Sequence, residues 1–166
     1  MARVVFVGLP GVGKSTLGAA LAQRLHLPFV DADQAFSEQQ GLSVQESLRS
    51  EGEGAFRRRE LAVLESLLTL EAVVATGGGV VTTPQARVLL RSQPTCWIDA
   101  SDEVILPRLG EGDRPLLGTD PGEVLARLRT DRAPLYREVS RWKIDANRSI
   151  EELIDEVMGL LGALRA

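Results

Sequence analysis

The sequence predicts a three-layer α/β/α protein in which helices cover both faces of a five-stranded parallel sheet. Short apolar runs of strand length alternate with longer segments in which apolar residues recur at helical spacing. The first run is followed at once by GLPGVGKS (8–15), which fits the phosphate-binding pattern GxxxxGK[ST] between a strand and a helix. The 166 residues, 44% of them hydrophobic, show no internal repeat or linker. We therefore expect one domain, spanning 1–166, with a sizeable core.

The expected strands are the apolar runs themselves, at 3–7, 28–31, 72–76, 95–99 and 141–145. The expected helices lie at 14–25, 33–40, 43–50, 53–69, 84–92, 102–109, 121–138 and 149–164. Two of these helices begin with the spacing of a capping box, Ser43 with Glu46 and Ser149 with Glu152. A third begins at Pro84, a residue suited to the first helical position.

Composition narrows the class of protein. The net charge of −4 argues against a general electrostatic grip on nucleic acid, which needs a basic face. No apolar run is long enough to span a bilayer and no leader precedes the first strand, so we expect a cytoplasmic protein without a membrane partner. The single cysteine, Cys96, lies in an apolar run and is expected to be a buried thiol. The sole histidine, His26, falls near a helix end, so a histidine general base is not expected.

Segment 8–15 predicts a site for a nucleoside triphosphate. Its glycines leave backbone N–H groups free to converge on phosphate oxygens at the positive end of the following helix. Lys14 would reach the β- and γ-phosphates, and Ser15 would ligate Mg²⁺. The residues expected to contact the nucleotide here are Gly11, Val12, Gly13, Lys14, Ser15 and Thr16. A glycine-rich turn that binds nothing is the alternative.

Two carboxylates follow the second strand. Ligands of open parallel sheets bind at the carboxyl ends of the strands, and Asp31 and Asp33 stand at such an end, as do the glycines 77–79 and Asp99. Because side chains alternate along a strand, Asp31 and Asp33 point in different directions. One can position Mg²⁺ through water while the other accepts a hydrogen bond from a substrate hydroxyl. Alternatively one or both cap the next helix, for which Asp33 is well placed.

Arginines suggest that the phosphoryl acceptor is itself an anion. Three consecutive arginines at 57–59 fan out about 100° apart on a helix, so one is expected to face a cleft, and Glu60 lies close enough to hold Arg57. A further arginine, Arg132, stands just before what we expect to be a helix end interrupted by Pro134. Solvated surface charges are the alternative for each. The Gly- and Pro-rich segment 110–121 is either a connector or a lid that excludes water during phosphoryl transfer.

Taken in order, GLPGVGKST, DAD, GExxFRxxE, GGG, RPLL and RAPLYR resemble the motifs of the shikimate kinases, over nearly the whole chain. The resemblance implies a P-loop kinase fold of the nucleoside-monophosphate-kinase type, with a substrate-binding helical region near 33–60 and a mobile lid near 110–120. The implied reaction transfers the γ-phosphoryl group of MgATP to the 3-hydroxyl of shikimate, a step towards chorismate and the aromatic amino acids. The partners are then shikimate and ATP, and we expect a monomer.

The resemblance also implies roles for individual residues. Asp31 would support the metal through water, Asp33 would hold the shikimate hydroxyls and act as the base, and Arg114 in the lid would close on the γ-phosphate. The remaining implied contacts are Arg57 and Arg132 to the shikimate carboxylate, Gly77, Gly78 and Gly79 as the wall of the acceptor pocket, and Arg108 and Arg148 in the adenine pocket.

Other classes remain open from the residues alone. A gluconate-type kinase would share the loop, sheet and lid, but has no evident need for Arg57 and Arg132 together with Asp33. A nucleoside monophosphate kinase would require a base-recognition pocket. A GTP-dependent switch would carry an Asn-Lys-x-Asp segment, and neither lysine, Lys14 or Lys143, lies in one. A folded protein without catalysis is disfavoured, because the core motif residues are present.

Overall fold

A five-stranded, entirely parallel sheet forms the centre of the computed structural model, which describes residues 1–109 and 120–164. The strands run in the order β2-β3-β1-β4-β5. Their bounds are β1 (Val4–Val7), β2 (Phe29–Asp31), β3 (Val73–Ala75), β4 (Thr95–Asp99) and β5 (Trp142–Asp145). The central strand β1 is wholly buried. The strand order reverses on either side of β1, which is where ligands bind in open parallel sheets.

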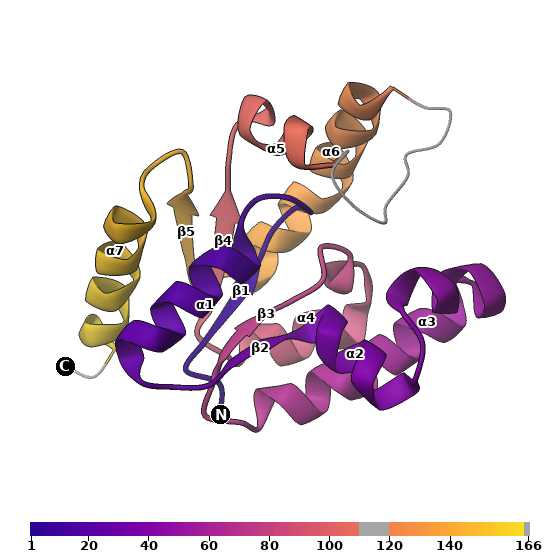
Figure 1. Cartoon of the computed structure of the whole chain (residues 1–166), viewed down its shortest axis with the longest axis horizontal. Coiled ribbons are helices and arrows are strands. Elements are labelled where there is room, and N and C mark those ends of the chain that lie inside the picture. Colours follow the sequence, from indigo (N-terminus) through magenta and orange to yellow (C-terminus); the bar gives the residue numbers. More distant parts are fainter. Residues whose placement is uncertain (110–119, 165–166) are drawn as a thin grey trace.

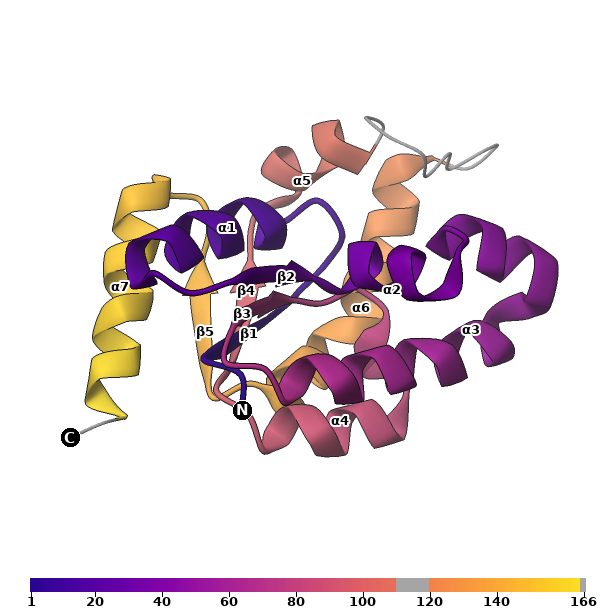
Figure 2. The ribbon, with the colours of Figure 1, turned by 60° about the horizontal axis from the view of Figure 1, so that its bottom comes forward.

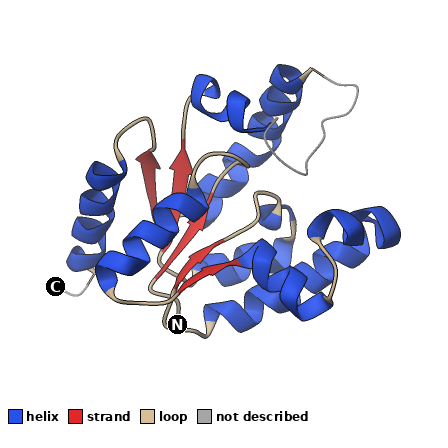
Figure 3. Ribbon diagram, in the orientation of Figure 1, coloured by secondary structure: helices blue, strands red, loops and turns tan. Residues whose placement is uncertain are grey.

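Helices cover both faces of this sheet (Figure 1; Figure 2). One face carries α1 (Lys14–Leu25) and α7 (Ile150–Ala163), and the other carries α4 (Pro84–Arg91), α6 (Pro121–Val139) and the second half of α3 (Val44–Leu68). Helix α2 (Ala32–Gln40) and the first half of α3 extend beyond the β2 edge, and α5 (Asp102–Leu109) lies beside α6. Figure 3 shows the strands of the sheet enclosed by helices. The predicted three-layer α/β/α fold is confirmed.

Helix α6 spans Pro121–Val139, close to the predicted 121–138. It continues through Pro134 without the interruption expected there, so Arg132 lies inside the helix. Its C-terminal turns are buried through Tyr136 and Val139, and this packing outweighs the helix-breaking tendency of proline. A short 3₁₀ helix, Val80–Thr82, had not been predicted. The predicted helices 43–50 and 53–69 meet as α3 at a kink where Gly52 has φ 81°.

Both predicted capping boxes are present. At the start of α3, the Ser43 hydroxyl accepts the Glu46 N–H at 3.1 Å, and the Glu46 carboxylate accepts the Ser43 N–H at 2.7 Å. These bonds satisfy two of the N–H groups that the first turn of a helix leaves without partners. The signal read from the sequence therefore corresponds to a real helix start.

Removal of the α3 cap gives a prediction for stability. We expect Ser43→Ala to lower the free energy of unfolding by about 1 kcal/mol, since an orphan helix N–H loses its acceptor. Urea denaturation followed by circular dichroism measures this. The matched control is Ser50→Ala in the same helix, where the hydroxyl bonds back to the Glu46 carbonyl at 2.7 Å and alanine should cost nothing. Equal losses in the two variants would contradict the role of the cap.

Cys96 and His26 lie where the sequence predicts. Cys96 is buried, and burial raises the pKa of its thiol to about 12, so it remains a neutral core residue. His26 is exposed and forms the C-cap of α1 in the left-handed conformation. None of the described helices combines the length and hydropathy needed to cross a membrane.

Candidate active site

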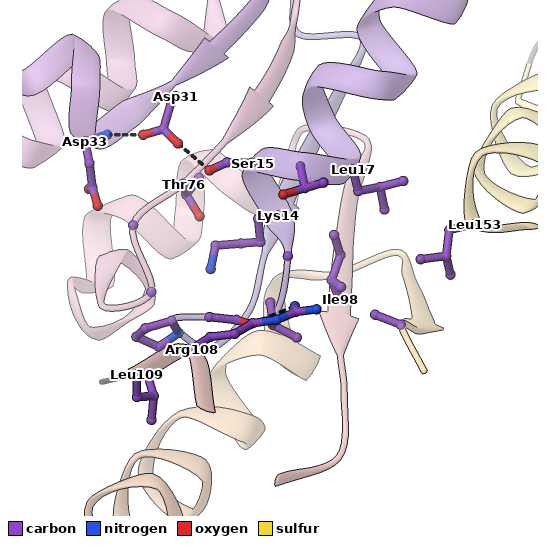
Figure 4. A pocket seen from close by; sticks show the side chains of 18 of the residues that line it. Lys14, Ser15, Leu17, Asp31, Asp33, Thr76, Ile98, Arg108, Leu109 and Leu153 are labelled. Carbon is purple, nitrogen blue, oxygen red and sulfur yellow. Dashed lines mark hydrogen bonds between the residues drawn. The ribbon is translucent and has the colours of Figure 1, made fainter. Parts of the chain in front are cut away.

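Two adjoining cavities open at the carboxyl edge of the sheet. The larger, of about 570 Å³, follows the phosphate loop and is shown in Figure 4. The smaller, of about 240 Å³, lies between α3, α6 and the loop after β3. The residues that line both are Pro10, Asp33, Gln45, Gly77, Gly78 and Leu109. Because the two cavities share these lining residues, a ligand in one would lie next to a ligand in the other, as the transfer of a group between two substrates requires.

The phosphate loop is folded as an anion site. Gly13 precedes α1 with φ 103°, a conformation that side chains other than glycine rarely adopt, and no side chain caps the helix there. The first N–H groups of α1 therefore remain available to phosphate oxygens. The Lys14 ammonium donates to the carbonyls of Gly8 at 2.8 Å and Leu9 at 2.9 Å, and it projects into the larger cavity (Figure 4).

Asp31 links the phosphate loop to the start of α2. One of its carboxylate oxygens accepts the Ser15 hydroxyl at 2.5 Å, and the other accepts the N–H groups of Asp33 at 2.9 Å and Gln34 at 3.3 Å (Figure 4). Asp31 is thus the N-cap of α2. The alternative that one of the two carboxylates caps this helix is confirmed for Asp31, and the expectation that Asp33 is the cap was wrong. Capping through Asp31 leaves the Asp33 side chain to line both cavities.

The oxygens of Ser15 and Asp31 fit a Mg²⁺ ion. Both are hard ligands, and they lie beside the loop where phosphate oxygens would complete an octahedral shell. Within residues 1–109 and 120–164 there is no group of three or more His, Cys, Asp or Glu side chains that could hold a metal alone. This agrees with the usual way in which Mg²⁺ is bound, through one or two protein oxygens together with the substrate phosphates.

Two helices bring arginines to the smaller cavity, whose lining also includes the carboxylates of Asp33 and Glu60. Arg57 of α3 pairs with Glu60 at 2.7 Å, while Arg132 lines the opposite side from α6. Burial raises the pKa of Glu60, although the Arg57 guanidinium acts in the opposite direction. Of the three consecutive arginines only Arg57 lines this cavity, because Arg58 is exposed and Arg59 pairs with Glu51 at 2.7 Å. The helical geometry inferred from the sequence is confirmed.

The three glycines after β3 lie against the other parts of the site. A Cβ atom on Gly77 would stand 2.7 Å from an Asp33 carboxylate oxygen, and one on Gly79 would stand 2.3 Å from the Arg57 guanidinium. A Cβ atom on Gly78 would stand 2.8 Å from Pro10 of the phosphate loop. Side chains at these positions would displace the groups on which a ligand depends, so the backbone itself forms this wall.

Arg108 and Arg148 line the larger cavity but have protein partners. Arg108 donates to the Gly11 carbonyl of the phosphate loop at 3.1 Å. Arg148 pairs with Glu156 and donates to the Asp145 carbonyl at 3.2 Å. Arg114 and residues 110–119 of the predicted lid lie outside the described residues, so the predictions for them stay predictions.

Sequence reasoning missed the apolar residues of the site, and it singled out one strand-end carboxylate, Asp99, that lies outside the site. The apolar side chains that line the smaller cavity from the helices had not been predicted, because apolar residues on an amphipathic helix are normally assigned to the hydrophobic core. They are Val44, Leu48, Phe56, Val124 and Leu128. Asp99 is the last residue of β4 but lines neither cavity. It pairs with Arg129 at 2.8 Å and Lys143 at 3.0 Å. Burial opposes its ionisation, but these hydrogen bonds outweigh burial and lower the pKa of Asp99.

The parallel sheet, the phosphate loop and the adjoining cavity with its two arginines together define a P-loop kinase that acts on a small anionic acceptor. A family model described as shikimate kinase matches residues 10–161. The curated shikimate kinase of Thioalkalivibrio sulfidiphilus is 40% identical to this chain, over 93% of this chain and 84% of the relative. The curated shikimate kinase of Enterococcus faecalis is 37% identical, over 95% of this chain and 97% of the relative. The chain belongs to the shikimate kinase family.

Solved structures agree with this assignment. The shikimate kinase of Acinetobacter baumannii in complex with shikimate superimposes with a TM-score of 0.90 and 33% identity, covering 96% of this chain and 92% of that one. The enzyme of Aquifex aeolicus gives a TM-score of 0.84 and 32% identity, covering 99% and 98%. The predicted P-loop kinase fold and the predicted class of enzyme, an ATP-using kinase of the shikimate pathway, are confirmed.

Proposed function

We propose that this chain transfers the γ-phosphoryl group of MgATP to the 3-hydroxyl of shikimate, with ATP in the larger cavity and shikimate in the smaller one. The observation that carries the proposal is the junction of the two cavities at Asp33, with Arg57 and Arg132 lining the acceptor side. Shikimate bears one carboxylate and three hydroxyls, which suit two guanidinium groups and one carboxylate acceptor. The complex of the Acinetobacter baumannii relative with shikimate supports the choice of acceptor.

We assign the nucleotide to the phosphate loop and α1. Backbone N–H groups of Gly11, Val12 and Gly13 and the first turn of α1, including Thr16, would surround the phosphates. Lys14 would turn from the loop carbonyls to the β- and γ-phosphates, and Ser15 with Asp31 would hold Mg²⁺, which supplies charge neutralisation. The adenine end would lie towards Arg108 and Arg148, and Arg114 keeps the role that the resemblance implies.

We assign the acceptor to Asp33 and the two arginines. Arg57, held by Glu60, and Arg132 would grip the carboxylate, while Asp33 orients the attacking hydroxyl and receives its proton. The glycines 77–79 would form the backbone wall against the ring. In phosphoryl transfer the protein mainly positions the reactants and stabilises the charge that spreads over the transferred group, and these residues supply both functions.

The test is a coupled assay of ATP consumption with shikimate, run beside quinate, gluconate and AMP. Strong turnover with shikimate alone is expected, since quinate and gluconate are also hydroxylated carboxylates and probe the shape of the cavity. Turnover with another acceptor would keep the nucleotide assignment and overturn the roles of Arg57, Arg132 and Asp33. Omission of Mg²⁺ should abolish turnover, and restoration by added Mg²⁺ tests the metal assignment.

The carboxylate grip gives a second prediction. We expect Arg132→Ala and Arg57→Ala each to weaken shikimate binding by about 1.5–3 kcal/mol, since a charged hydrogen bond is lost, and to leave ATP binding unchanged. Calorimetric titration of each ligand measures both affinities. The matched control is Arg58→Ala, which removes an exposed neighbour of Arg57 on the same helix and should change neither. Equal weakening of shikimate and ATP would indicate a folding defect instead of a lost contact.

We further propose that residues 1–166 act as one domain and as a cytoplasmic monomer. Both cavities are lined by residues of the same chain, which supports a site that one copy can complete. Sedimentation of the active protein with both substrates tests this, and a dimer that dissociates with loss of turnover would refute it.

A further inference from the structure

One buried hydroxyl, bonded to the glycine wall of the acceptor cavity, has no part in the reaction assigned above. The side chain of Tyr136 on α6 is 1% exposed, and its phenol donates to the carbonyl of Gly78 at 2.6 Å. The two residues are far apart in the sequence, so this bond joins α6 directly to the loop that follows β3. Burial raises the pKa of Tyr136 to about 12, so the phenol keeps its proton at neutral pH.

The partner of this phenol lies at the centre of the site. Gly78 is the middle residue of the glycine wall and lines both cavities. Its Cα faces Pro10 of the phosphate loop, while its neighbours Gly77 and Gly79 face Asp33 and Arg57. A shift of the Gly78 carbonyl would therefore move a backbone segment that leaves no room for a side chain beside Pro10, Asp33 and Arg57.

The same helix supplies one of the groups that grip the acceptor. Arg132 lies four residues before Tyr136, one helical turn away and on the same side of α6. The distance between Arg132 and the glycine wall is thus fixed by the bond that Tyr136 makes one turn further along. Trp97 of β4 packs on the Tyr136 ring, with centroids 5.9 Å apart, and holds the ring in place.

From this geometry we infer that Tyr136 is a positioning residue for shikimate: its hydroxyl fixes the glycine wall relative to Arg132 and so sets the width of the acceptor cavity. The inference rests on the proposed function. It predicts an effect on the acceptor rather than on the nucleotide, because Arg132 on the same helix lines only the acceptor cavity, whereas Lys14 and Ser15 belong to α1.

The test is Tyr136→Phe, which keeps the ring and removes the hydroxyl, and with it both the bond to the Gly78 carbonyl and the side-chain hydrogen bond to Arg132. We expect the KM for shikimate to rise about tenfold, equivalent to about 1.4 kcal/mol, while the KM for ATP stays within about twofold. An unchanged KM for shikimate, or an equal rise in both values, would overturn the inference. Replacing Tyr136 by p-aminophenylalanine restores a donor on the same ring and should return the KM for shikimate towards that of the wild type.

A matched control separates positioning from stability. Thr95→Val removes another buried hydroxyl that donates to a backbone carbonyl, that of Leu90 at 2.7 Å, in β4 and away from both cavities. This variant should lose comparable thermal stability and keep both KM values. A rise in its KM for shikimate equal to that of Tyr136→Phe would assign the effect to general loosening and overturn the inference.

Failure of the proposed function and failure of the inference give different results. A wild type that does not phosphorylate shikimate would overturn the proposed function and the inference together, whereas normal turnover with an unchanged KM in Tyr136→Phe overturns the inference alone. If Tyr136→Phe does not fold, the p-aminophenylalanine variant is compared with p-methylphenylalanine at the same position, which fills the same space without a donor. The variant without the donor should have the higher KM for shikimate, and equal values in the two would overturn the inference.

Discussion

Replacement of Asp33 by Asn is expected to lower kcat with shikimate by about two to three orders of magnitude, because the amide cannot receive the proton of the attacking hydroxyl. The substitution keeps the shape of the side chain and the backbone N–H bond from Asp33 to Asp31, so α2 should start as before. ATP affinity, measured by titration, should stay within about twofold of the wild type. Near-wild-type turnover would remove Asp33 from the mechanism.

A second substitution separates the two functions of Asp33. Asn can still orient a hydroxyl by a hydrogen bond, whereas Ala can neither orient it nor receive its proton. If positioning dominates, Asp33→Ala should be slower than Asp33→Asn; if proton transfer dominates, the two should be equally slow. Asp131→Asn, an exposed carboxylate on α6, is the matched control and should retain full activity.

The second large effect is expected at Lys14. Lys14→Met keeps the aliphatic length of the buried side chain but removes the charge that would stabilise the transferred phosphoryl group. We expect kcat to fall by about two to three orders of magnitude, the loss typical of one preorganised electrostatic contact. Steady-state kinetics at saturating shikimate measures this, and thermal melting checks that the loop still folds.

The sequence offers its own control, since Lys143 is the other lysine of the chain. Lys143 lies on β5, pairs with Asp99 at 3.0 Å and lines neither catalytic cavity. Because Arg129 also pairs with Asp99, Lys143→Met leaves that carboxylate a cationic partner, and turnover should stay within about twofold of the wild type. A comparable loss in both variants would show that the effect at Lys14 is not specific to phosphate.

Most of the fold could be predicted because its signals are local. Apolar runs give the strands, capping boxes give two helix starts, and GxxxxGK[ST] ties a strand to a helix. The continuity of α6 at Pro134 could not be predicted in the same way. Pro134 is a local signal for an interruption, but burial of Tyr136 and Val139 beyond it is a tertiary effect that a local signal does not contain.

The site follows the same division between local and tertiary information. Charged residues at strand ends, such as Asp33, and the Arg57–Glu60 spacing indicate chemistry directly. The Tyr136–Gly78 bond carries no such signal, since its two members lie 58 residues apart in the sequence. Asp99 is an error of the opposite kind. Its position at a strand end suggested a site residue, but it forms ion pairs with Arg129 and Lys143 and lines neither cavity.

The register between β1 and β3 determines how the phosphate loop lies relative to the glycine wall, so enzymatic activity depends on that register. Phe6 stands opposite Ala75, and the Phe6 carbonyl accepts both the N–H of Thr76 at 3.1 Å and its hydroxyl at 3.0 Å. The phosphate loop leaves β1 and the glycine wall leaves β3 just beyond this point. A slip of one residue would displace the two loops by about 3.3 Å, more than a hydrogen-bond length, and turn each side chain to the opposite face. A misaligned chain could therefore keep much of its helix content and be catalytically silent, so turnover reports correct folding more strictly than circular dichroism does.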